Sequence, residues 1–149
     1  MLPENFDRES YIAGLREKHA RILPPDIAFS VENGWLPLIA ESLDQIEQAL
    51  GRHGWIAKAN IRQIKEKLGD LRIYVRPRWE SASFPKALGN ELSDIRERFT
   101  SRSVQTCEIC GDAGQLDNFA GYLQTLCPRH ADQRREWIAR GRKGDVFHD

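Results

Sequence analysis

The sequence predicts an α+β protein, mostly helical with a small sheet, followed by a small cysteine-containing module. Two observations predict this division. In residues 8–101, apolar side chains recur every three or four positions in several segments, and short runs of strand-forming residues lie between them. From residue 106 onward the pattern changes to paired cysteines, glycine turns and a histidine. We therefore expect an α+β core in residues 1–103 and a module packed on it in residues 104–149.

The composition fits one folded domain with a small appended module. The 149 residues include 22 Lys+Arg and 22 Asp+Glu, so no net charge draws the chain to nucleic acid or anionic lipid. The 40% of hydrophobic residues argue against long disorder. No apolar run reaches the length of a membrane span, and the N-terminal segment MLPENFDRES lacks the layout of a signal peptide. Three cysteines exclude a complete set of disulfides within the chain, so we expect a cytoplasmic protein.

The first third of the chain predicts a helix, a short strand and a longer helix. Residues 8–22 carry apolar side chains at helical spacing, and two consecutive prolines after them must end that helix. Residues 27–31 (IAFSV) favour a brief strand. Residues 35–50 hold the clearest apolar stripe of the sequence, and Pro37 lies in the first turn, where proline is tolerated.

The middle of the chain predicts a helix, a strand, a loop and a further helix. Residues 56–68 place three aliphatic side chains three or four positions apart, which favours one face of a helix. Residues 71–75 (LRIYV) favour a strand, and the prolines and small polar residues of 76–86 favour a loop. Residues 88–101 again show helical spacing, and we expect the C-terminal module to dock on this helix.

Two charge blocks occupy this middle region. Residues 26–50 contain five acidic and no basic side chains, whereas residues 51–65 contain four basic and no acidic ones. One interpretation is that two neighbouring helices attract each other weakly through their solvent-facing sides. The other is an acidic face that docks a basic partner, with Glu41, Asp44 and Glu47 as contact residues.

Four residues in two pairs form the pattern that carries chemistry. Cys107-x-x-Cys110 is separated by sixteen residues from Cys127-x-x-His130. Three thiols and an imidazole are the donor types that a tetrahedral Zn²⁺ site uses, and the two-residue spacing lets one turn direct both members of a pair at one ion. The glycine after the first pair permits such a turn. A proline after Cys127 suits the start of a helix, which would place His130 in its first turn.

The same cysteines have a second interpretation, a redox Cys-x-x-Cys pair with an unrelated buried cysteine. Such a pair opens a helix, whereas Gly-Asp-Ala-Gly follows Cys110. Residues 116–119 and 122–126 predict a hairpin between the two ligand pairs. This order of knuckle, hairpin and helix resembles a treble-clef zinc finger over residues 106–141. Because the protein supplies all four ligands, we expect one structural Zn²⁺ per chain, with no position open for water.

Catalysis finds little support in the sequence. No nucleophile has an adjacent base, and no glycine loop is arranged to cradle phosphate, so we expect neither an enzyme nor a small-molecule substrate. Nucleic-acid binding is the alternative function. A loop with Arg76, Arg78 and Trp79 could contact phosphate and stack a base, and the C-terminal helix is locally basic. Its basic residues are Arg129, Arg134, Arg135, Arg140, Arg142 and Lys143.

Three segments together resemble a family of small uncharacterised proteins of bacteria and their phages. They are GWLPLIAESLDQIEQAL, QIKEKLGDLRIYV, and CEICGDAG with TLCPRHA, which together span residues 34–131. The resemblance implies the same four metal ligands, and it marks Gly34-Trp35, Lys65-Glu66-Lys67 and Leu71–Tyr74 as signatures without a role. Small neutral proteins in such genomes are often toxin-immunity factors or inhibitors in phage–host conflict, so the resemblance implies a function of that kind by analogy alone.

The sequence as a whole predicts a non-enzymatic, zinc-stabilised protein that acts by stoichiometric binding. The expected partner is a protein, such as a toxin or a defence component, and no membrane is involved. The expected contact residues lie on the acidic helix and in the loop after the strand. They are Glu41, Asp44, Glu47, Arg76, Arg78 and Trp79.

Overall fold

The computed structural model describes residues 2–148 and confirms the α+β class. Short 3₁₀ turns lie at Asn33–Trp35 and Ile56–Lys58. The helices and strands are, in chain order, α1 (Arg8–Lys18), β1 (Phe29–Ser30), α2 (Leu36–Arg52), β2 (Ala59–Lys67), β3 (Asp70–Pro77), α3 (Lys86–Ser103), β4 (Gln115–Phe119), β5 (Tyr122–Leu126) and α4 (Pro128–Ala139).

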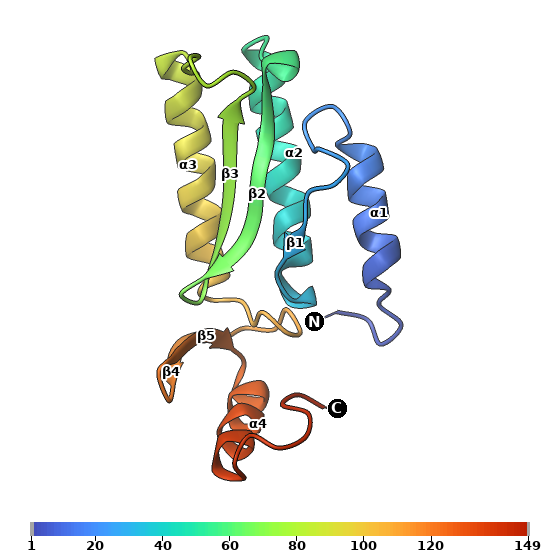
Figure 1. The fold of residues 1–149 in the computed structure, drawn as a ribbon, viewed down its shortest axis with the longest axis vertical. Coiled ribbons are helices and arrows are strands. Elements are labelled where there is room, and N and C mark those ends of the chain that lie inside the picture. The colour runs from blue at the N-terminus through green and yellow to red at the C-terminus, as the bar shows by residue number, and fades with distance from the viewer. Residues whose placement is uncertain (1, 149) are drawn as a thin grey trace.

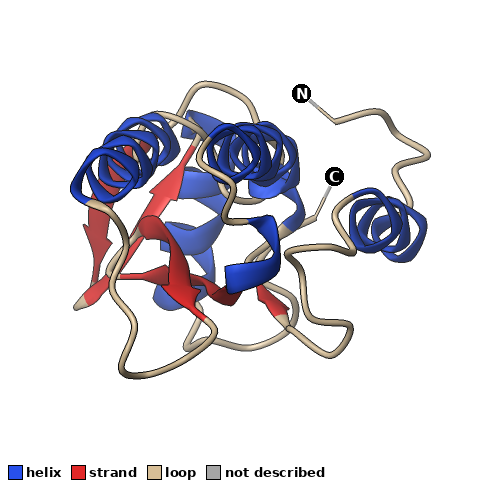
Figure 2. Cartoon of the chain, turned by 90° about the horizontal axis from the view of Figure 1, so that it is seen from above, coloured by secondary structure: helices blue, strands red, loops and turns tan. Residues whose placement is uncertain are grey.

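The first unit is a three-stranded sheet with helices on one side. Its strand order is β1-β2-β3, with β1 parallel to β2 and β2 antiparallel to β3. Figures 1 and 2 show α2 and α3 together on one side of β2 and β3, and α1 beside β1. Alternate residues of a strand point to opposite faces, so Leu71, Ile73 and Val75 enter the core under the helices. The outer face of β2 and β3 is covered by no helix of residues 2–148.

The predicted helix over residues 56–68 is wrong, because these residues form most of β2. Ile61 and Ile64 are both buried although they lie three positions apart. The pairing of β2 with β3 shifts register between Ile61 and Gln63, which inserts Arg62 as an extra residue. Such a bulge restores both isoleucines to the inner face, and it gives a strand the apolar spacing of a helix.

The third aliphatic residue of that apparent helical face lies in the turn after β2. Leu68 has a φ of 52° and Gly69 a φ of 86°, which is the two-residue turn that suits an antiparallel hairpin. The Leu68 side chain is 61% exposed, so it does not contribute to the core.

The other elements were predicted in kind, with differences at their ends. Helix α1 ends at Lys18, and the backbone N–H of His19 caps it before the prolines are reached. The strand expected over 27–31 is reduced to two residues. Helix α2 has its proline in the first turn, as predicted, and continues to Arg52. The strand at 71–75 and the helix at 88–101 are confirmed within longer elements.

The second unit consists of the antiparallel β4–β5 hairpin and α4, below one end of the first unit in Figure 1. Its expected docking on the helix at 88–101 is only partly right. Helix α3 leads into the second unit, but hydrogen bonds between the units also join it to Leu2, to residues 32–35 and to the β2–β3 turn. Within residues 2–148, no helix has the length and apolar character needed to cross a bilayer.

Candidate metal centre

The first pair of ligands lies in a tight turn that follows α3. The Cys107 N–H donates to Asp112 O at 2.7 Å, and the Gly111 N–H donates back to Cys107 O at 2.9 Å. Gly111 has a φ of 85°, a conformation that residues with a Cβ rarely adopt. The predicted need for glycine after Cys110 is therefore confirmed, and the turn directs both sulfurs to one side.

The second pair lies at the start of α4. Cys127 is the N-cap residue, and its sulfur accepts a hydrogen bond from the His130 N–H at 3.5 Å. Pro128 occupies the first turn, where its missing N–H costs nothing. Hairpin β4–β5 delivers this pair to the first turn, so the predicted order of knuckle, hairpin and helix is confirmed.

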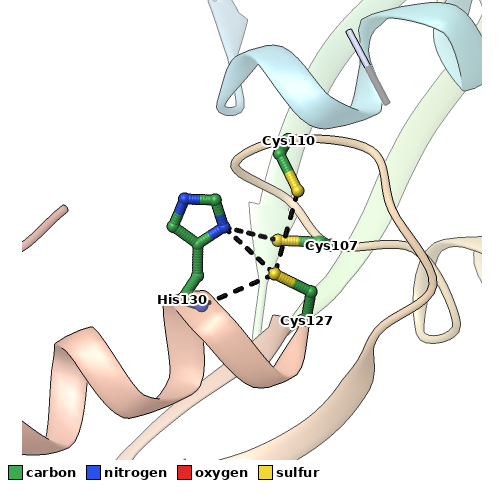
Figure 3. A group of neighbouring side chains, drawn as sticks. All are labelled: Cys107, Cys110, Cys127 and His130. Atoms are coloured by element: carbon green, nitrogen blue, oxygen red, sulfur yellow. Dashed lines mark hydrogen bonds between the residues drawn. The ribbon is translucent and has the colours of Figure 1, made fainter. Parts of the chain in front are cut away.

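The four side chains meet at one point, as Figure 3 shows. His130 Nδ1 lies 3.5 Å from Cys107 Sγ and 3.2 Å from Cys127 Sγ, and Cys110 Sγ lies 3.8 Å from Cys127 Sγ. Tetrahedral bonds of about 2.3 Å to sulfur and about 2.0–2.1 Å to nitrogen separate two sulfurs by about 3.8 Å, and a sulfur from a nitrogen by about 3.6 Å. The spacing of the donor atoms therefore fits a tetrahedral metal ion such as zinc.

The surroundings of the sulfurs fit the same conclusion. All four ligands are buried, and the three cysteines are free thiols. Burial raises the pKa of the Cys107 thiol and raises the pKa of the Cys110 thiol to about 12. Thiolates packed this closely in a buried site need a cation to compensate their charge. The arrangement favours a four-ligand metal site over an isolated redox pair, because all three sulfurs belong to one cluster.

The knuckle packs directly on the backbone that precedes α2. The Gly34 N–H donates to Glu108 O at 2.6 Å, and the Trp35 indole N–H donates to Thr106 O at 2.9 Å. A Cβ at position 34 would lie 2.5 Å from Glu108 O and 2.6 Å from Gly111 N, which no side chain tolerates. The Gly34-Trp35 signature therefore has a structural role. It is the surface on which the turn at residues 107–111 packs; we call this turn the metal turn and residues 34–35 its seat.

Glu108, between the two cysteines of the knuckle, also joins the units. Its side chain accepts hydrogen bonds from the Glu32 N–H at 3.1 Å and from the Gln124 amide at 3.2 Å. Glu108 is only 3% exposed, and burial raises the pKa of its carboxyl. No signal in the sequence indicates this role, because an acidic residue in a turn is ordinarily solvated.

The three predicted acidic contact residues all have partners inside the chain. Glu41 pairs with Arg102 of α3, Asp44 with Lys18, and Glu47 with Arg21. His19, 1% exposed, lies 3.2 Å from a carboxylate oxygen of both Asp44 and Glu47. The partners come from α1, from the turn that follows it and from α3, rather than from the basic block at 51–65.

The basic residues singled out in the sequence lie in separate places. Arg76 lies at the end of β3, and Arg78 and Trp79 follow in the loop, where Arg78 donates to Arg21 O at 3.0 Å. On α4, Arg135 pairs with Asp117, and the Arg134 guanidinium lies 4.9 Å from the centre of the Tyr122 ring. Several α4 arginines are therefore engaged within their own unit.

A further group of cations lies on β2 and β3. The prediction of a helix over residues 56–68 does not bring these cations together as a group. Lys65 and Lys67 of β2 lie opposite Arg72 and Asp70 of β3. The alternation of Lys65 with Lys67, and of Arg72 with Tyr74 and Arg76, was the available signal, since polar side chains at every second position have the period of a strand. The two signature segments without a role thus pair with each other in the hairpin.

The fold and the side-chain cluster define an α+β protein with a C-terminal module whose Cys₃His cluster suits a metal ion such as zinc. Comparisons of the chain with protein-family models, with curated proteins and with solved structures give no match. The chain's own residues therefore carry the inference of function.

Proposed function

We propose that the protein is a non-catalytic binding protein, held in shape by one structural Zn²⁺ per chain, and that it binds an anionic partner stoichiometrically. The contact surface is the outer face of the β2–β3 hairpin. One observation carries the proposal: this open face gathers five cations and one carboxylate, in a chain whose net charge is zero. We call this group the basic sheet face, and its cations are Arg62, Lys65, Lys67, Arg72 and Arg76.

Hydrogen bonds and register support the membership of this face. Lys65 is the direct cross-strand neighbour of Arg72, and Lys67 that of Asp70. The bulge adds Arg62 to the same face, where it donates to the Asn60 side chain at 3.0 Å, and Asn60 lies opposite Arg76.

The cations of the face are largely uncompensated. Arg72 is paired with Asp70, at 2.6 Å. Within residues 2–148, the other four cations have no carboxylate oxygen within 4.0 Å. Five like charges are held together here with one carboxylate, and that carboxylate is paired with Arg72, so the arrangement favours an anionic ligand.

Tyr74 lies in the middle of the face, and its hydroxyl group feels the positive charge of the surrounding cations. The Arg72 guanidinium donates to the Tyr74 hydroxyl at 3.4 Å, and this bond lowers the pKa of the phenol, with further contributions from the charges of Lys65 and Lys67. The Lys65 ammonium lies 5.9 Å from the centre of the Tyr74 ring.

The structural zinc serves this function indirectly. It holds the second unit on the end of the hairpin, where the Thr125 hydroxyl donates to Gly69 O at 2.8 Å. The free thiols of the cluster suit a reducing cytoplasm. An immunity factor or a defence inhibitor of this kind would take an acidic protein on the basic sheet face.

Retention on a heparin column in a salt gradient tests the proposal. Lys65→Glu combined with Lys67→Glu should elute at much lower salt than the native protein. Arg129→Glu combined with Lys143→Glu is the matched control, since both residues are exposed on the second unit and the change in net charge is the same. The control should elute close to the native protein. Equal losses in the two variants, or a larger loss in the control, would refute the basic sheet face and favour the C-terminal helix.

A further inference from the structure

We infer that the basic sheet face binds single-stranded nucleic acid, with phosphates on its cations and a base against Tyr74. This inference rests on the proposed function and names the partner of the same surface. The alternative anionic partner, an acidic protein surface, becomes an outcome of the test.

The first argument is the presence of an aromatic ring at the centre of the cations. Tyr74 lies between Arg72 and Arg76 on β3, and its cross-strand neighbour is Gln63. The Arg76 guanidinium lies 5.3 Å from the ring centre, on a half-exposed tyrosine. Surfaces that bind single strands combine cations for the backbone with aromatic rings and arginine planes for the bases. An acidic peptide would need the cations but not the ring.

The second argument is the spacing of these groups. Alternate residues of a strand lie about 6.6–6.8 Å apart, and neighbouring strands about 4.8 Å apart. The hairpin therefore presents successive rows: Lys67 beside Asp70, Lys65 beside Arg72, and Gln63 beside Tyr74. On the other side of Tyr74 the next row is Asn60 beside Arg76, so a base at Tyr74 would have a cation for the phosphate on either side.

The third argument separates single strands from duplexes. Bases in a duplex are read by an element that enters a groove, such as a helix or a ribbon. In residues 2–148, the outer face of β2 and β3 carries no such projecting helix. β2 and β3 are themselves backed by α2 and α3, so what they present is an open face with a ring and cations, the kind of surface on which unpaired bases stack. Past the end of β3, Trp79 is 57% exposed and offers a second ring for stacking.

Fluorescence anisotropy with the zinc-loaded full chain tests the inference. The probes are labelled 12-nucleotide oligo-dT and oligo-rU, a mixed-sequence duplex of the same length, and a labelled poly-glutamate peptide. Either single strand should bind more tightly than the duplex and the peptide. With four uncompensated cations, the slope of log affinity against log salt should be about −3, from about −0.7 per phosphate contact.

Variants then locate the contact. Tyr74→Leu keeps an apolar strand residue and should weaken single-strand binding roughly tenfold, as expected for the loss of one stacked base. Tyr122→Leu is the matched control, because Tyr122 is also an exposed tyrosine under an arginine, but on the second unit. Unchanged binding by the Tyr74 variant, or equal losses in both variants, would overturn the inference.

The two proposals fail differently. Suppose that retention on heparin depends on Lys65 and Lys67, but that the duplex or poly-glutamate binds at least as tightly as the single strands. This result overturns the single-strand inference and leaves an anionic partner on the basic sheet face. If the lysine variant elutes from heparin no earlier than its control, both proposals are refuted. Preference for single strands that depends on Tyr74 and on both lysines supports both.

Discussion

The two units of this protein are stabilised by different physical means. The first unit buries large apolar side chains from all its helices and strands, including Trp35, Leu43, Ile61 and Phe99. In the second unit, the buried cluster adds Phe119, Leu126 and Ala131 to the cysteines. A core of that size cannot hold a hairpin and a helix together, because so little apolar surface leaves water. The comparison teaches that the second unit gathers a Cys₃His cluster, suited to a metal ion, where the first unit has an apolar core.

The junction between the units depends on both. Residues 32–35 belong to the first unit, yet their N–H groups find acceptors in the metal turn. The turn that carries Cys107 and Cys110 therefore also completes the hydrogen bonding of the chain that enters α2. Four predictions follow the difference between the units, from the largest effect to the smallest.

Loss of the metal should unfold the second unit and spare the first. A structural zinc in a small module contributes about 10–16 kcal/mol at neutral pH, far more than the few buried apolar side chains of this unit can replace. Cys107→Ser, or a strong chelator, should expose residues 104–148 to trypsin, while a fragment containing β2, β3 and α2 persists. Metal analysis of the native protein should give one zinc per chain, and zinc added back after chelation should restore resistance. A metal-free variant with a protease-resistant C-terminal unit would show that the apolar contacts suffice.

A side chain at position 34, where the metal turn packs, should push the two units apart without removing the metal. Gly34→Ala places a methyl group against backbone atoms of Glu108 and Gly111, and such overpacking should cost about 3 kcal/mol. The expected result is a lower free energy of unfolding in urea with the zinc content unchanged.

Gly14→Ala is the matched control for this change. No atom lies within 4 Å of a Cβ placed there, on helix α1, so the same substitution should stabilise the protein by up to about 1 kcal/mol. A stable Gly34→Ala variant would mean that the metal turn can move away from its seat at little cost.

Removing one hydrogen bond across the junction should have a smaller effect. Trp35→Phe keeps an aromatic ring in the core but leaves Thr106 O without the indole N–H. The expected loss is about 1–2 kcal/mol, measured by thermal or urea unfolding. Hydrogen exchange should increase around the metal turn more than in β2 and β3. A uniform increase would indicate that the ring supports only the first unit's core.

The smallest effect is electrostatic and distinguishes the tyrosines of the two units. Burial raises the pKa of Tyr122 on the second unit and of Tyr11 on α1, whereas the hydrogen bond from Arg72 lowers the pKa of Tyr74. An NMR titration should therefore find Tyr74 ionising first, below the usual pKa of about 10. Arg72→Met should shift that titration upward and leave Tyr122 unchanged. A native Tyr74 that ionises last would contradict the positive potential assigned to the basic sheet face.

The metal ligands and the longest helix could be predicted because neighbouring residues determine them. The Cys-x-x-Cys turn, the proline after Cys127 and the first turn of α4 all lie within a few residues of the atoms that they position. The stripe of α2 likewise needs no information from outside the segment. A prediction that rests on local geometry of this kind stays correct even where the rest of the fold is predicted wrongly.

Strand β2 and the surfaces could not be predicted in this way, because distant residues decide them. A bulge opposite β3 gives β2 an apolar spacing that a helix would share, and pairing with β3 alone distinguishes the two. The acidic side chains of α2 form ion pairs with α1, with the turn after it and with α3, whose places the sequence does not specify.

The sequence by itself determined the α+β class, the four residues of the Cys₃His cluster and the presence of most helices, since turns and periodicity are local. Tertiary structure decided that Gly34 seats the metal turn, that Glu108 is buried between the units, and that cations from β2 and β3 share one open face. The physical reason is the same in each case: these properties arise only when strand pairing and packing bring together residues that are far apart in the chain.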